Sequence, residues 1–86
     1  MLFFALSKGG VSEFVSLLQE SENHQLWVSG GVLSPQEIGK LRASGISVSV
    51  FAHEVHLEDS VAMAHAFDVI REHHPSAVIW SEAQTS

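Results

Sequence analysis

The sequence contains no cysteine and few basic residues, and these two shortages exclude several kinds of protein. Without cysteine there can be no disulfide framework, no thiolate zinc site and no thiol nucleophile. Four Lys and Arg stand against ten Asp and Glu, so the net charge is −6 with histidine neutral. Such a chain has no basic surface to bind nucleic acid or an anionic membrane, and we expect neither partner.

Long hydrophobic runs are also missing. The first run, at 2–6, is far shorter than the about 20 apolar residues of a membrane helix, and no basic segment precedes it as in a signal peptide. We therefore expect a cytoplasmic protein. Because 45% of the 86 residues are hydrophobic, the chain is expected to fold as one small domain, at 1–81, followed by a polar tail at 82–86.

Short β-rich runs alternate with segments of helical periodicity along the chain. Strands are predicted at 2–6, 26–28, 46–52 and 77–80. Helices are predicted at 11–18, at 35–44, and from 58 to the proline at 75. The second helix has the strongest local signals, because Ser34 and Glu37 form a capping box with Pro35 at the first helical position.

This alternation, β-α-β-α-β-α-β, predicts an α/β domain with a four-stranded parallel sheet and right-handed crossovers. We place the strands in the order 2-1-3-4, a truncated flavodoxin-like arrangement. In that order the first helix covers one face, and the second and third helices cover the opposite face. The third and fourth strands then have no helix on the first face.

The uncovered face predicts an interface. Phe51 of the third strand would be exposed there, together with Ile79 or Trp80 of the fourth. Because an exposed apolar patch usually marks an interface, and a two-fold axis lets one patch serve both subunits, we predict a homodimer. The alternative is that a different strand order, or the C-terminal tail, covers these side chains.

Two serine- and glycine-rich turns follow the first two strands, at the edge where parallel sheets bind ligands. Backbone N–H groups at the starts of the following helices suit a phosphate or a carboxylate. The second turn, with the pattern Ser29-Gly-Gly-Val-x-Ser34, resembles the phosphate-binding turns of some βα-barrel enzymes. The alternative is that the glycines serve tight turns and helix packing. The candidate ligand-binding residues are Ser7, Lys8, Gly9, Gly10, Ser29, Gly30 and Gly31.

Six histidines outnumber the basic residues, and His53 and His56 stand closest to further metal-capable side chains, Glu58 and Asp59. They are the candidate ligands of a divalent metal. Their spacing is not that of the His-Glu-x-x-His motif, and exposed loop histidines are the alternative interpretation.

No complete catalytic or cofactor motif is present: there is no Gly-x-Ser-x-Gly elbow, no P-loop and no dinucleotide fingerprint. We therefore expect no cofactor, and we favour a non-catalytic module that acts by self-association or through a protein partner. The alternative is binding of a small anionic ligand or a divalent metal at the carboxyl edge of the sheet, which leaves an enzymatic activity open.

Overall fold

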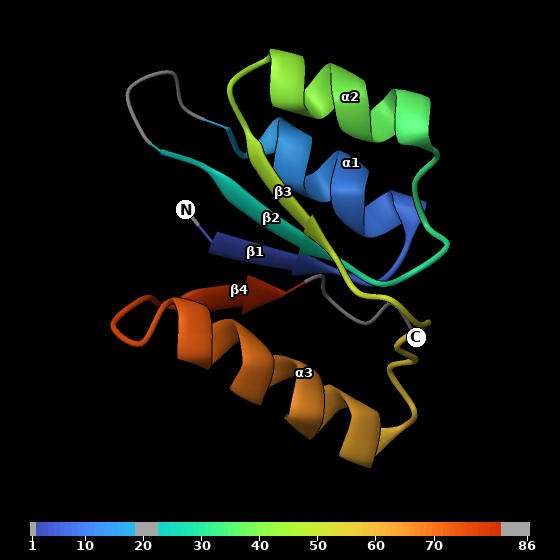
Figure 1. Ribbon diagram of the computed structural model, residues 1–86, viewed down its shortest axis with the longest axis vertical. Coiled ribbons are helices and arrows are strands. Elements are labelled where there is room, and N and C mark those ends of the chain that lie inside the picture. The colour runs from blue at the N-terminus through green and yellow to red at the C-terminus, as the bar shows by residue number, and fades with distance from the viewer. Residues whose placement is uncertain (1, 19–22, 82–86) are drawn as a thin grey trace.

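A computed structural model of the chain describes residues 2–18 and 23–81, so the predicted tail lies outside the described residues. The elements, drawn in Figure 1, are β1 (Leu2–Ala5), α1 (Lys8–Ser16), β2 (Gln25–Val28), α2 (Pro35–Ala43), β3 (Ser47–Val50), α3 (Ser60–His73) and β4 (Ile79–Ser81). The predicted α/β class with a four-stranded parallel sheet is confirmed. Within the described ranges, no helix has the length and apolar character needed to span a bilayer.

The strand order is β3-β2-β1-β4, so the predicted order 2-1-3-4 and its flavodoxin-like arrangement are wrong. The chain steps from β1 to β2 to β3 in one direction and then returns to the far side of β1 for β4. This is the order of the first four strands in dinucleotide-binding sheets. Since right-handed crossovers in the same direction place their helices on the same face, α1 and α2 lie together.

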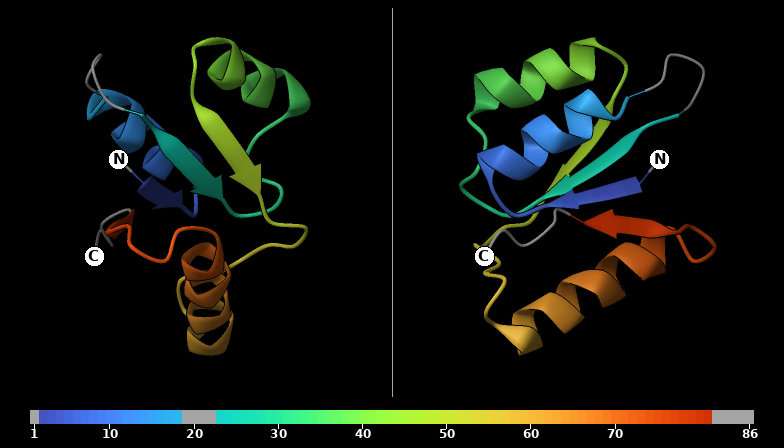
Figure 2. Two further views of the ribbon diagram at one scale, coloured as in Figure 1. Left: turned by 60° about the vertical axis from the view of Figure 1, so that its left-hand side comes forward. Right: turned by 180° about the vertical axis from the view of Figure 1, so that it is seen from behind.

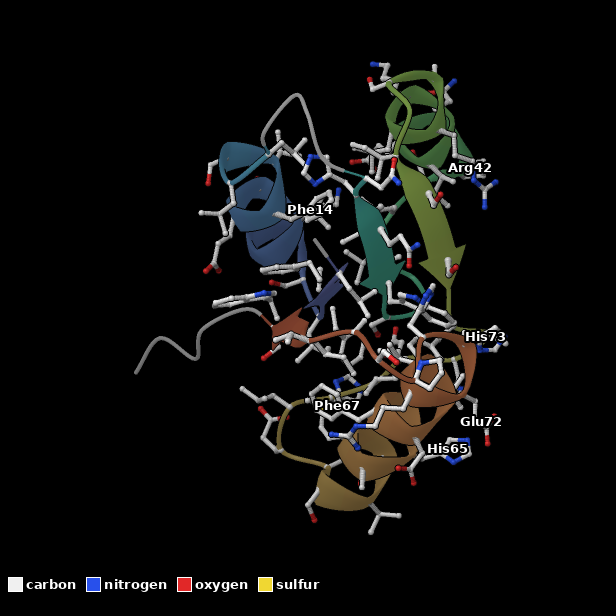
Figure 3. The ribbon with its side chains drawn as sticks, turned by 90° about the vertical axis from the view of Figure 1, so that its left-hand side faces the viewer. Phe14, Arg42, His65, Phe67, Glu72 and His73 are labelled. Atoms are coloured by element: carbon white, nitrogen blue, oxygen red, sulfur yellow. The ribbon has the colours of Figure 1, made fainter. Side chains whose placement is uncertain are left out.

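The sheet therefore separates two cores, and Figure 2 shows α1 and α2 on one side with α3 on the other. On the α1–α2 side, Phe3 packs against Phe14 with ring centroids 5.7 Å apart. On the α3 side, Phe4 contacts Phe67 at 5.7 Å, and Ile70 is fully buried. Figure 3 shows Phe14 and Phe67 in these opposite layers.

Each helix begins at a side chain that accepts a hydrogen bond from the first turn. Ser7 Oγ accepts from Gly10 N at 3.2 Å, and Asp59 accepts from Ala62 N at 3.0 Å. Asp59 is thus the N-cap of α3, and the helix predicted from residue 58 begins at Ser60. The predicted capping box of α2 is confirmed.

Phe51 does not lie on an exposed face. It is 8% exposed and packs in the α3-side core, 5.5 Å from the rings of both Phe4 and Trp27. The prediction of an exposed Phe51 is wrong because the strand order places β3 beside β2, where Trp27 shields this side chain.

Candidate functional site

The loops that follow β1, β2 and β3 form an open pocket at the carboxyl edge of the sheet, the edge where parallel α/β sheets bind ligands. The cavity has a volume of about 210 Å³ and is lined by Leu6, by residues 29–32 and by residues 54–56. Three of the seven predicted ligand-binding residues, Ser29, Gly30 and Gly31, line this pocket. It is the first of two candidate sites.

The second glycine turn is held by the β3–α3 loop. Ser29 is buried, and its Oγ accepts a hydrogen bond from Val55 N at 2.7 Å. Gly30 N donates to the carbonyl oxygen of His53 at 2.9 Å. A Cβ at Gly30 would lie 2.6 Å from that same oxygen, so the close approach of the two loops requires glycine there. Gly31, with φ +82°, adopts the left-handed conformation that favours glycine.

The first glycine turn is not part of this pocket. Lys8, Gly9 and Gly10 are already helical residues of α1, whose N-cap is Ser7. Lys8 Nζ lies 4.0 Å from Glu37 of α2. The structure therefore does not bring the two turns together around one ligand. It also commits the Gly10 and Gly30 N–H groups to bonds within the protein, which weakens the case for an anion site.

The two candidate metal ligands have different neighbours. His56 Nε2 lies 3.2 Å from a carboxylate oxygen of Glu54, and both residues line the pocket. The ring contact of His53 is with Phe51, at 6.2 Å. Across residues 2–18 and 23–81, no three His, Asp or Glu side chains are grouped closely enough to hold a metal ion. The pocket thus has a carboxylate–imidazole pair at its rim.

The second candidate site is an apolar surface on β4. Trp80 pairs with Phe3 in the parallel register, and paired residues of neighbouring strands point to the same face, so Trp80 lies on the α1 side. Its side chain is 59% exposed, and that of Val78 is 72% exposed. We call Val78 and Trp80 the β4 surface. Both also line a cavity of about 320 Å³ at the amino edge of the sheet.

A further exposed apolar residue, Leu17, stands at the end of α1. Lys8 faces Glu37 of α2, and Leu17 follows Lys8 by two and a half helical turns, so it lies on the opposite flank of α1. Leu17 is 49% exposed on the flank that faces away from α2. The structure thus adds Val78 and Leu17 to the predicted exposed residues, neither of which stands out in the sequence.

The three predicted interface residues have three different environments. Ile79 pairs with Leu2, which turns it to the α3 side, where it is half-buried against the core. Phe51 is buried, as described above. Trp80 alone of the three is exposed.

Comparison of the chain with protein-family models, with curated proteins and with solved structures gives no match. The fold and the two sites define a small parallel α/β domain. The carboxyl-edge pocket and the β4 surface are the two features of this domain from which a function can be inferred.

Proposed function

We propose that this chain is a non-catalytic association module whose partner is a second copy of itself, bound through the β4 surface. The observation that supports this most is the 59% exposure of Trp80 on a face of an edge strand that no helix among residues 2–18 and 23–81 covers. Tryptophan is among the residues that most often dominate binding energy at interfaces. A two-fold axis would let the same surface serve both copies.

The exposed part of Trp80 sets the size of the effect. A whole aromatic side chain buries roughly 150–250 Å², so 59% exposure leaves about 90–150 Å² available to a partner. At about 25 cal/mol per Å², its burial contributes about 2–4 kcal/mol per copy. If the dimer buries Trp80 fully in both copies, the two contributions add, and removal of Trp80 raises Kd by about three to five powers of ten.

Sedimentation velocity over a range of concentrations tests this. The wild-type chain is expected to dimerise, and Trp80→Ser is expected to be monomeric at the same concentrations. The matched control is Val61→Ser, which removes an exposed apolar side chain from α3, on the opposite face. A wild-type chain that stays monomeric, or a Trp80→Ser variant with unchanged affinity, would overturn the proposal.

A second function, binding of a divalent cation at the carboxyl edge, is supported by the pocket itself. The Glu54–His56 pair on its rim favours a cation over the anion that the glycine turns suggest. Calorimetric titration with zinc tests this, with Glu54→Gln expected to abolish binding and Glu58→Gln, outside the pocket lining, to retain it. The absence of a heat of binding at micromolar zinc would refute a cation site at this pocket.

We also propose a cytoplasmic location for the module. The support is its cysteine-free composition, which needs no oxidising compartment for folding.

A further inference from the structure

The two edge strands of the sheet, β3 and β4, present their free backbone groups differently. In β3, Ser47 N donates to His24 O at 3.1 Å and Phe51 N donates to Val28 O at 3.0 Å. The backbone N–H and C=O groups of the alternate residues 47, 49 and 51 therefore point to β2. Within a parallel strand the N–H and C=O of one residue point to the same side. The backbone groups of Val48 and Val50 therefore face the free edge.

The free edge of β3 is partly blocked by the guanidinium group of an arginine. Arg42 of α2 donates from Nη2 to the carbonyl oxygen of Val48 at 2.9 Å. Figure 3 shows the Arg42 side chain on the outer side of β3, away from β2. A charged side chain that occupies an edge carbonyl discourages another strand from pairing there.

The free edge of β4 has no such guard on the strand itself. Ser29 N donates to Ala5 O at 3.0 Å, so the backbone N–H and C=O groups of Ala5, and of Phe3 two residues before it, point to β2. Those of Phe4, between them, point to the other neighbour, β4. With Phe4 opposite Ser81 in the register, the backbone of Trp80 points to β1. The N–H and C=O groups of Ile79 and Ser81 then point to the free edge, and no side chain of 79–81 carries a charge.

Building on the self-association proposed above, we infer that two copies join β4 to β4 in antiparallel pairing, around a two-fold axis at Trp80. In this register Ile79 of each copy exchanges N–H···O=C bonds with Ser81 of the other. Trp80 then faces the second copy's Trp80 at the close spacing of a non-hydrogen-bonded pair. The axis is perpendicular to the sheet, so both indoles stay on the α1 side, where no helix of the described residues lies over β4.

The same geometry limits the assembly to a dimer. Pairing of β4 with itself is isologous and consumes that edge in both copies. A β4 edge that paired instead with β3 of the next copy would build an open-ended sheet, but Arg42 occupies the Val48 carbonyl that such pairing needs. The second copy is therefore favoured at β4 and disfavoured at β3.

Amide hydrogen exchange of the wild-type chain, followed residue by residue at low and high protein concentration, tests the register. Dimer formation is expected to slow exchange at Ile79 and Ser81 by about tenfold or more, because their N–H groups become bonded. Trp80 N–H, which already points to β1, is expected to change much less and is the internal control. A dimer in which Ile79 and Ser81 exchange as fast as in the monomer would overturn edge pairing, while self-association would stand.

The absence of native cysteine allows a second measurement. Non-hydrogen-bonded antiparallel pairs bring their Cβ atoms close enough for a disulfide. Trp80→Cys weakens the non-covalent dimer as Trp80→Ser does but keeps the backbone bonds of the edge, so mild oxidation at high protein concentration is expected to trap it as a covalent dimer. Val61→Cys, on α3 at a position that is 78% exposed against 59% for Trp80, is expected to stay monomeric. Equal crosslinking of the two variants would contradict the register. A wild-type chain that is monomeric at every concentration would instead refute the proposed function itself.

Discussion

Replacement of Gly30 by alanine tests whether the second glycine turn is a structural crossing between two loops. An ideal Cβ at this position would lie 2.6 Å from the His53 carbonyl oxygen, 2.7 Å from its carbon and 2.8 Å from the Phe51 carbonyl oxygen. All three atoms belong to the backbone, so no side-chain rotation relieves the overlap. Either the β2–α2 loop or the β3–α3 loop must move.

The cost can be worked out from the contacts that such a movement disturbs. Overpacking by one methyl group costs about 1–3 kcal/mol. The shift also lengthens the 2.9 Å bond from Gly30 N to His53 O and strains the buried 2.7 Å bond between Val55 N and Ser29 Oγ, which adds about 1–3 kcal/mol. We expect a total loss of about 2–6 kcal/mol. A domain of 86 residues has a free energy of unfolding of about 4–13 kcal/mol, so the loss is large.

Urea unfolding followed by tryptophan fluorescence measures this, since Trp27 is buried in the α3-side core. The matched control is Gly39→Ala in the middle of α2, where a Cβ meets nothing within 4 Å. That variant is expected to gain about 0.5–1 kcal/mol from helix propensity. If Gly30→Ala is as stable as the wild-type chain, the two loops do not approach as closely as described. Ligand binding would then be the better explanation of the glycine at this position.

Further predictions concern single contacts and charge. Ser29→Ala is expected to lose about 1–3 kcal/mol in the same unfolding assay, because a buried N–H group loses its acceptor; an unchanged midpoint would contradict this. The hydrogen bonds from the backbone and then the side chain of the N-cap serine lower the pKa of Glu37 below 4.5. Its contribution to stability is therefore present above pH 4.5 and lost as pH falls through the lowered pKa, so Glu37→Gln is expected to show a flatter fall in Tm over this acid range. Arg42→Ser is expected to open the β3 edge and give assemblies larger than a dimer in light scattering, whereas Lys40→Ser, on the same helix, is not. Self-association is expected to strengthen in sedimentation as pH falls from about 8 to 6 towards the isoelectric point near 5.3, because the net negative charge of the chain and its self-repulsion decrease; an unchanged equilibrium would count against this.

The existence and type of every element follow from local sequence patterns. The capping box at Ser34 and Glu37 places the start of α2 correctly, since all its atoms lie within one helical turn. Strand order depends instead on which strand each crossover returns to, and no local pattern records that. The prediction placed β3 beside β1, whereas the chain places it beside β2, so the fate of Phe51 was predicted wrongly.

The same distinction applies to the carboxyl edge. Serine and glycine after β2 mark residues 29–31 as unusual in the sequence alone, and they do line a pocket. The structural role of Gly30, to let two loops approach closely, follows from the His53 carbonyl, which belongs to a loop distant in sequence. The sequence places Glu54 at this edge as well, but its contact with His56 on the pocket rim is visible only in the folded loop.

Trp80 is exposed for a reason that does not depend on the strand order. With right-handed crossovers, the predicted order and the observed order both place α3 on the face opposite to α1, and both put β4 at the end of the sheet. In either arrangement none of the three described helices covers the α1 side of β4, because α1 covers the strands that it connects. Phe51 lies on a strand whose neighbour differs between the two orders, so its exposure changes with the order. A partner of this domain is therefore to be sought at β4, the edge strand that presents Trp80 on a face left uncovered by α1, α2 and α3.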